Sequence, residues 1–318
     1  MNALPLAQPE TIDPRILRRA LGNFATGVTI VTAHDGEHMV GVTANSFSSV
    51  SLDPPLVLWS IDKRAGSYSV FQRASHFAVN VLAMDQIDLS NRFARPHDNR
   101  FSGVAWRSGH GGCLLIEDTS ASFQCQKYQT IEGGDHWILI GRVVAFEDNG
   151  RAPLLYHQGS YSMALPHPHR EQPPTIERQA DALPDRLADH PYYLMMQAVR
   201  AYQQAYQPEQ LDTGWHPGEA RILMILAGGS CPDAAALAQA ADMPQHEVEQ
   251  SLDLLRSRGL VRREGRCDSL TEAGTQQVCD IWRQAQQQEE KVLARFDAAQ
   301  IRTFKKVLKG IIAAASPD

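Results

Sequence analysis

The side chains best suited to bind a polar ligand lie between Gly41 and Asp62, where short polar residues precede an apolar strand. The hydroxyl and amide side chains of this stretch are those of Thr43, Asn45, Ser46, Ser48, Ser49 and Ser51. Such groups donate and accept hydrogen bonds over a short reach, which suits a polar ligand lying along a strand edge. A Ser/Thr-rich β-segment without a ligand has the same composition, so other residues must decide between the two interpretations.

Basic side chains and further hydroxyls follow directly. The polar residues here are Ser60, Asp62, Lys63, Arg64, Ser67 and Ser69, and Gly66 precedes a predicted helix. Cations and hydroxyls next to the start of a helix are typical of a phosphate-binding site. A solvated turn followed by a capped helix is the alternative interpretation.

A histidine follows a predicted hairpin turn later in the chain. Glu132-Gly133-Gly134-Asp135 is a turn signal, and it places His136 at the start of a strand that leads to Arg142. A histidine in this position could contact an amide or a phosphate of a cofactor. Two further aromatic residues, Tyr156 and Tyr161, flank a small-residue turn.

Several common catalytic motifs are absent from the sequence. The chain contains no GxGxxG, GxxxxGK[ST], HExxH or GxSxG motif. Ser60 to Lys63 matches SxxK, but that chemistry needs both residues on one helical turn and here they end a strand. The five cysteines (Cys113, Cys125, Cys231, Cys267 and Cys279) form no CxxC pair. We therefore predict neither a metal site nor a disulfide framework.

Length and charge narrow the class of protein. A chain of 318 residues predicts two domains. The formal net charge of −6 gives no general attraction to nucleic acid or to an anionic membrane. The start of the chain lacks the pattern of a secretory signal, no apolar stretch is long enough to span a bilayer, and the scattered cysteines fit a reducing compartment. We expect a cytoplasmic protein.

The elements that must position these residues fall on either side of a proline-rich segment. Residues 166–184 contain five prolines and are predicted to form a linker between domains 1–165 and 185–318. Before the linker we predict a helix from Pro14 to Gly27 and short helices at 66–73 and 85–93. Strands are predicted at 28–33, 39–51, 56–61, 77–82, 121–131 and 136–146. Many antiparallel strands with few helices indicate a β-barrel.

After the linker the pattern becomes helical. We predict helices at 191–207, 216–227, 233–241, 244–258, 271–296 and 298–315, with a short hairpin at 260–270. Three helices followed by a hairpin are the order of a winged helix, and the flanking helices could pair two copies of the chain.

Taken together, these segments resemble the flavin reductase family of two-component monooxygenases. The matching segments are 21–29 (LGNFATGVT), Gly41–Pro55, Ser90–Phe93, Gly133–Val143 and Leu155–Tyr161. They cover nearly all of residues 12–165 and occur in the family's order. The whole chain resembles the two-domain form of these reductases, which serves monooxygenases of the 4-hydroxyphenylacetate type. That form carries a C-terminal domain similar to MarR regulators.

The resemblance implies a split β-barrel homodimer with one flavin per subunit near the subunit interface. It implies an enzyme that uses NADH to reduce FMN, which then diffuses to a separate oxygenase; FAD and NADPH remain open alternatives. His136 would orient the nicotinamide, with Arg142 and Tyr161 nearby. The implied cofactor-binding residues are Thr43, Ala44, Asn45, Ser46, Ser49, Ser60, Asp62, Lys63, Ser67, Phe93, Arg142 and Tyr161.

Two functions are open for the C-terminal domain. Arg262, Arg263 and Arg266 on the predicted hairpin favour DNA binding, but the predicted recognition helix begins with Glu247 and Glu249, which oppose it. The alternative is a sensor for an aromatic acid. Aromatic and cationic side chains for such a site are Tyr193, Tyr202, Trp215 and Arg221.

Two proteins of other classes would share these features. One is a flavin-binding transcriptional regulator of the MarR type with little turnover. The other is a split-barrel protein that is not a reductase, such as a relative of pyridoxine-phosphate oxidases or a haem-binding protein. The joint occurrence of the 41–55 and 133–142 segments favours the reductase.

Overall fold

The computed structural model describes residues 13–95, 99–164, 190–212, 215–229 and 232–315. The chain divides into two compact units. The first unit comprises residues 1–164 with 234–250, and the second comprises residues 165–233 with 251–318. The predicted linker at 166–184 lies outside the described residues.

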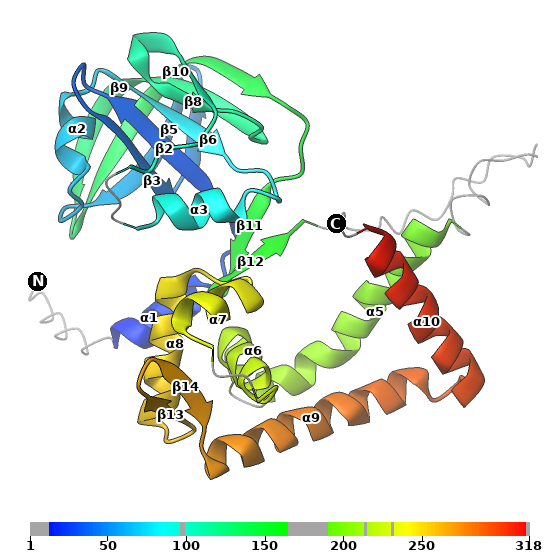
Figure 1. The fold of residues 1–318 in the computed structure, drawn as a ribbon. Coiled ribbons are helices and arrows are strands. Elements are labelled where there is room, and N and C mark those ends of the chain that lie inside the picture. The colour runs from blue at the N-terminus through cyan, green and yellow to red at the C-terminus, as the bar shows by residue number, and fades with distance from the viewer. Residues whose placement is uncertain (1–12, 96–98, 165–189, 213–214, 230–231, 316–318) are drawn as a thin grey trace, which may run out of the picture. The chain divides into compact units, whose positions relative to one another are not determined.

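A seven-stranded antiparallel sheet forms the centre of the first unit, and it curls into the barrel seen in Figure 1. Its order is β3-β2-β6-β9-β10-β5-β4. The strands are β2 (Thr29–His34), β3 (Met39–Ala44), β4 (Ser48–Leu52), β5 (Pro55–Asp62), β6 (His76–Val81), β9 (Ala121–Gly133) and β10 (His136–Asp148). The sheet's two edge strands, β3 and β4, follow each other in sequence, so this order fits the β-rich barrel that the sequence predicted.

Smaller elements complete this part of the chain. The helices are α1 (Pro14–Leu21), α2 (Tyr68–Arg73) and α3 (Ile87–Phe93), with a 3-10 turn η1 (His110–Gly112). A three-stranded sheet joins β1 (Thr26–Gly27), β11 (Leu154–His157) and β12 (Ser160–Met163), and β7 (Trp106–Ser108) pairs with β8 (Leu114–Ile116). The sequence analysis predicted none of these five short strands, because each is too short to show a periodic pattern.

The predicted single strand at 39–51 is wrong in one respect. The chain leaves β3 after Ala44 and resumes as β4 at Ser48, and the two strands pair with different neighbours. β3 pairs with β2 whereas β4 pairs with β5. The polar run therefore crosses from one edge of the sheet to the other, and Asn45 to Phe47 form the connection.

The barrel core packs around aromatic side chains from several strands. Trp59 is fully buried, and its ring lies 4.8 Å from Phe71 and 6.2 Å from Phe77, centroid to centroid. Gly141 lets β10 approach this core, since a Cβ there would lie 2.5 Å from Phe77 Cζ. The alternation of buried and half-buried residues along β5 places Trp59 inside and Ser60 and Asp62 on the other face.

A helical region follows the barrel in sequence. Its helices are α5 (Pro191–Asp212), α6 (Pro217–Leu226), α7 (Ala234–Ala240), α8 (Gln245–Ser257), α9 (Glu272–Leu293) and α10 (Ala298–Ala315). The hairpin strands β13 (Val261–Glu264) and β14 (Cys267–Leu270) lie between α8 and α9 in the chain (Figure 1). These elements match the predicted helices and hairpin closely. Within the described residues, no helix is long and apolar enough to cross a bilayer.

Two polar contacts fix the hairpin to its flanking helices in the second unit. Arg256 Nε donates to the buried Asp268 carboxylate at 2.9 Å, which joins the end of α8 to β14. Thr271 Oγ1 accepts from the Gly274 N–H at 3.0 Å and donates to the Gly259 carbonyl at 2.7 Å. The Thr271 hydroxyl therefore caps α9 at the residue where the sequence predicted the helix to begin.

Candidate active site

Three strands bring the predicted histidine beside the predicted basic turn. His136, the first residue of β10, lies opposite Asp62 on β5 and opposite Gly133 on β9. The Lys63 N–H donates to the Asp135 carbonyl at 3.0 Å, which ties the end of β5 to the β9–β10 turn. Segments about seventy residues apart in sequence are therefore neighbours, as the predicted site requires.

Lys63 occupies a defined position in this cluster. Its ammonium group is paired with the Glu132 carboxylate, and it lies 4.9 Å above the centroid of the Trp137 ring. The Trp137 ring stacks on Tyr68 with centroids 5.6 Å apart and an interplanar angle of 6°. The hydrogen bond from Lys63 holds the pKa of the Glu132 carboxyl below its usual value. Lys63 is therefore positioned by an aromatic face and by a carboxylate together.

Sequence analysis missed Glu132, Trp137 and Tyr68. The available signal was the hairpin turn itself, because a tight turn at 134–135 places Glu132 opposite Trp137 in the register of β9 and β10. Glu132 therefore lies on the same strand ladder as His136 and within reach of Lys63 across the sheet.

Asp62 and Arg64 are paired with each other. Arg64 donates from Nε to Asp62 Oδ1 at 3.1 Å and from Nη2 to Oδ2 at 2.7 Å, and its backbone N–H also donates to Oδ1 at 2.7 Å. These hydrogen bonds hold the pKa of the Asp62 carboxyl well below its usual range. Arg64 and Lys63 therefore each have a carboxylate partner, and of the two Lys63 is also held against an aromatic ring.

The predicted start of the helix at Gly66 is wrong by two residues. Helix α2 has only six residues, and it begins at Tyr68 rather than at Gly66. Ser67 stands at its N-cap position but its hydroxyl makes no capping hydrogen bond. A helix this short has a weak dipole, so an anion here would depend on the side chains.

His136 is partly exposed and held in one orientation. Its side chain is 40% exposed, and Nδ1 lies 2.7 Å from Asp135 Oδ1. This interaction holds the pKa of Asp135 below its usual value. When Nδ1 carries the proton and donates to Asp135, Nε2 of the neutral ring is an acceptor directed away from that contact.

The Thr43 and Ser46 hydroxyls form hydrogen bonds to backbone groups of neighbouring elements. Ser46 Oγ accepts from the Ser60 N–H at 2.9 Å and lies 3.2 Å from the Ser60 carbonyl, so it ties the β3–β4 connection to β5. Thr43 Oγ1 donates to the Ser90 carbonyl at 2.7 Å, and the Ala44 carbonyl accepts from Thr29. Asn45 and Ser49 are exposed. Of this segment, Asn45 therefore has the side chain most available to a ligand.

Two predicted cofactor-binding residues are core residues in the structure. The Phe93 side chain is 1% exposed, and its ring packs edge-on against Phe101 at 5.0 Å. Tyr161 is 8% exposed, and its hydroxyl bonds to Ser90 Oγ and Asn91 Oδ1, both at 2.9 Å. Phe93 has no surface for a ligand, and Tyr161 reaches the candidate site only through Ser90, which holds Thr43.

The structure also separates Arg142 from His136. Both residues lie on β10, six positions apart, which corresponds to roughly 20 Å along a strand. Arg142 lies opposite Leu56 at the other end of β5, and its guanidinium lies 5.5 Å from the Tyr128 ring centroid. Within one chain, Arg142 is therefore not part of the His136 cluster.

The predicted effector residues come from two helices and from the segment between them. Tyr193 and Tyr202 lie on α5, Arg221 is exposed on α6, and Trp215 precedes α6. The Arg258 guanidinium lies 5.1 Å from the Trp215 ring centroid and pairs with the buried Glu219 at 3.2 Å. The cation placed against the predicted tryptophan is therefore Arg258, which the sequence analysis did not select.

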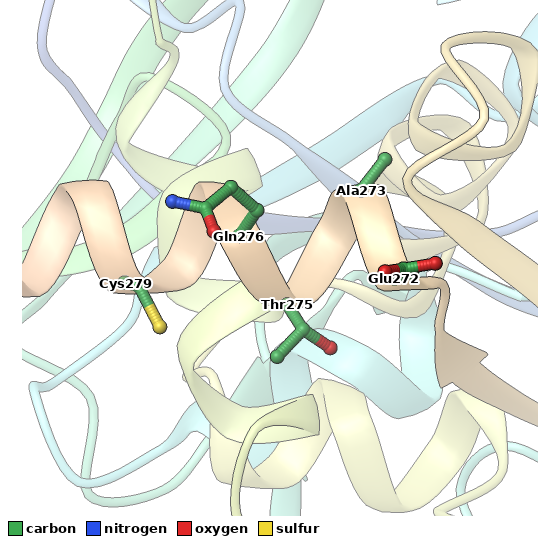
Figure 2. A pocket seen from close by; sticks show the side chains of 5 residues that line it. All are labelled: Glu272, Ala273, Thr275, Gln276 and Cys279. Atoms are coloured by element: carbon green, nitrogen blue, oxygen red, sulfur yellow. The ribbon is translucent and has the colours of Figure 1, made fainter.

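The described residues that line the pocket in Figure 2 do not form a recognisable catalytic group. The volume of this pocket is about 580 Å³, and the described residues that line it are exposed side chains of α9: Glu272, Ala273, Thr275, Gln276 and Cys279. None of them was a predicted site residue. Among the described residues, no group of three His, Cys, Asp or Glu side chains could hold a metal ion.

Comparison with known proteins identifies the family of the N-terminal half. Residues 21–164 match the family model described as "Flavin reductase like domain". A probable flavin reductase of Rhizobium meliloti (strain 1021) is 52% identical over 48% of this chain and 49% of its own length. The reductase component of a flavin-dependent trigonelline monooxygenase from Acinetobacter baylyi is 51% identical over 46% of this chain and 48% of its own length.

A shorter relative is matched over most of its length. The FMN reductase (NADH) SmoA of Agrobacterium fabrum is 43% identical over 47% of this chain and 85% of its own length. The chain spans about half the length of the two longer relatives. The matched segment contains the whole cluster of Asp62, Lys63, Glu132 and His136. By this similarity and its barrel fold, the chain belongs to the flavin reductase-like family.

Proposed function

We propose that this chain is an NADH-dependent flavin reductase that supplies diffusible reduced FMN to a separate aromatic monooxygenase. The observation that carries the proposal is the cluster of Lys63, Asp62 and His136 at one end of β5 and β10, inside the segment that matches the family. The names of the relatives, an FMN reductase (NADH) and a monooxygenase reductase component, support the choice of cofactors and of partner.

The donor set of the cluster fits a flavin nucleotide. Lys63 supplies a positioned cation for a phosphate, Asn45 an exposed amide, and Ser60 a half-buried position on the outward face of β5. His136 Nε2 could accept a hydrogen bond from a nicotinamide carboxamide and so orient that ring. The bound cofactors supply the chemistry, which is hydride transfer from nicotinamide C4 to flavin N5. The protein then needs to hold both rings in contact, and no acid–base pair is required.

The first experiment measures NADH oxidation by the purified full-length chain with FMN in excess. We expect turnover on the order of 1–1,000 per second, since typical kcat values of enzymes fall in this range. Parallel assays with FAD and with NADPH decide the two open cofactor choices. Absence of turnover with both flavins and both nicotinamide cofactors would contradict the proposed function.

We propose further that the helical region is a winged-helix sensor of the MarR type that binds an aromatic acid and modulates the reductase. Trp215 and Arg258 supply an aromatic face and a cation in contact, which suits a carboxylate attached to an aromatic ring. Glu219 already pairs with Arg258, so an acid would bind as a competitor for that guanidinium. 4-Hydroxyphenylacetate is the acid to test first.

Deletion of residues 166–318 tests this regulation. We expect the truncated chain to reduce FMN and to lose any response of its activity to 4-hydroxyphenylacetate. Since folding of the isolated barrel is not assured, the full chain with Trp215→Leu is the second variant, with the same loss of response expected at unchanged basal turnover. If 4-hydroxyphenylacetate still stimulates FMN reduction in both the truncated chain and the Trp215→Leu variant, the acid binds at another site.

A homodimer is the assembly we propose for the barrel. Several large apolar side chains of β4 and β10 are exposed in the single chain: Val50 at 48%, Leu52 at 93%, Val144 at 42% and Phe146 at 68%. β4 and β10 both pair with β5, and apolar exposure on strands of one sheet is typical of a surface that another protein covers. A second copy of the chain is the partner that the family resemblance favours.

A further inference from the structure

The candidate phosphate cation is already occupied by a carboxylate from its own chain. The Lys63 ammonium pairs with Glu132, although Lys63 itself is 29% exposed and accessible from solvent. Glu132 is 68% exposed, so little packing restrains its side chain. An ion pair this exposed contributes little to stability and is easily broken.

The charges around Lys63 do not favour an incoming anion. Two permanent cations, Lys63 and Arg64, face the carboxylates of Asp62, Glu132 and Asp135. The Asp62 carboxylate is held by Arg64 through a side-chain pair and a backbone hydrogen bond. Asp135 is held by His136. Glu132 is therefore the carboxylate that can leave most readily, and its departure exposes Lys63.

We propose that Glu132 competes with the flavin phosphate for Lys63, so that FMN binds by displacing the Glu132 carboxylate and is released when that carboxylate returns. The inference rests on the proposed function, because it takes Lys63 as the phosphate contact. Displacement removes one ion pair and leaves a carboxylate near a dianion, and both effects weaken FMN binding. A flavin that must diffuse to a second enzyme gains from a site that binds it weakly.

Riboflavin distinguishes this competition from other effects of Glu132, because it has the same ring and ribityl chain but no phosphate. Replacing Glu132 with glutamine keeps the size of the side chain and removes its charge. Glu147→Gln is a matched control, since Glu147 lies on β10 and forms an exposed ion pair with Arg107 of β7. Both variants change the net charge of the chain equally.

The experiment titrates FMN and riboflavin separately into the full-length wild type, Glu132→Gln, Glu147→Gln, Lys63→Ala and the Lys63→Ala/Glu132→Gln double variant. Flavin fluorescence or calorimetry gives each Kd without turnover. We expect Glu132→Gln to lower the Kd for FMN by about 3- to 10-fold and to leave that for riboflavin unchanged. The effect should shrink at about 1 M salt and vanish in the Lys63→Ala background.

Several results would overturn the proposal. They are an unchanged FMN Kd in Glu132→Gln, equal tightening of riboflavin, equal tightening in Glu147→Gln, or persistence of the effect without Lys63. If the wild type binds neither flavin, the proposed function fails and this inference fails with it. If the wild type binds both flavins and Glu132→Gln changes nothing, only the competition is wrong.

Discussion

Replacing His136 with alanine should lower kcat/KM for NADH by about 10- to 100-fold while the Kd for FMN changes less than about threefold. His136 is partly exposed at the start of β10, and its Nδ1 is held by Asp135 at 2.7 Å. The ring is therefore oriented before any ligand arrives, and its free nitrogen can meet the nicotinamide. Losing this acceptor leaves the carboxamide N–H of the bound nicotinamide without a partner, which costs roughly 1–3 kcal/mol.

Asp135→Asn is the control for this prediction. Asparagine keeps a side-chain acceptor for the His136 ring, so we expect less than about a threefold change in kcat/KM for NADH. Steady-state kinetics with each substrate varied in turn separates the two cofactors. A His136→Ala variant that loses FMN affinity but keeps its kcat/KM for NADH would assign the histidine to the flavin instead.

Replacing Asn80 with alanine should lower the free energy of unfolding of the barrel by about 2–4 kcal/mol. Asn80 is fully buried, and its Nδ2 donates to the Ile30 carbonyl at 3.0 Å while Oδ1 accepts from the Ile116 N–H at 2.9 Å. Alanine leaves the Ile116 N–H buried without this acceptor and opens a cavity. The short strand β8 is held to the sheet in part by this side chain.

Urea unfolding of the full-length variant measures the loss, and hydrogen exchange of the β8 amides locates it. Asn149→Ala is the control, because Asn149 is exposed although its amide donates to the Thr119 carbonyl at 2.9 Å. We expect that change to lower stability by less than about 1 kcal/mol. If Asn80→Ala and Asn149→Ala lower the free energy of unfolding equally, the buried hydrogen bonds of Asn80 contribute no more to stability than the exposed one of Asn149.

The residues that form the candidate site were largely recognisable in the sequence. His136 follows a glycine turn, and Lys63 follows an apolar strand, so both were predicted at strand ends. Strand pairing then confirmed that these ends meet, with His136 opposite Asp62. Local patterns were enough to select these two residues because both lie at strand ends that turn residues mark in the sequence. The register of the paired strands then determines which end residues are neighbours.

Sequence patterns do not show burial or distance, which matters for three other predicted site residues. Phe93 and Tyr161 lie in matching motifs, yet both are core residues, and Tyr161 acts on Thr43 only through Ser90. Arg142 shares a strand with His136, and the extended backbone carries it roughly 20 Å away. Motif position therefore does not determine the exposure of a side chain or its distance from His136, and the cofactor-binding roles of these residues stay predictions.

The sequence by itself determined most of the longer strands and helices, the change from strands to helices along the chain, and the family. Those features depend on local periodicity, turn residues and motif order, which one chain displays directly. Only the tertiary structure decided that the 39–51 run divides between opposite edges of the sheet, that Arg258 meets Trp215, and that Glu132 holds Lys63. These outcomes depend on contacts between residues that are distant in sequence. A local sequence pattern does not indicate which of those contacts form.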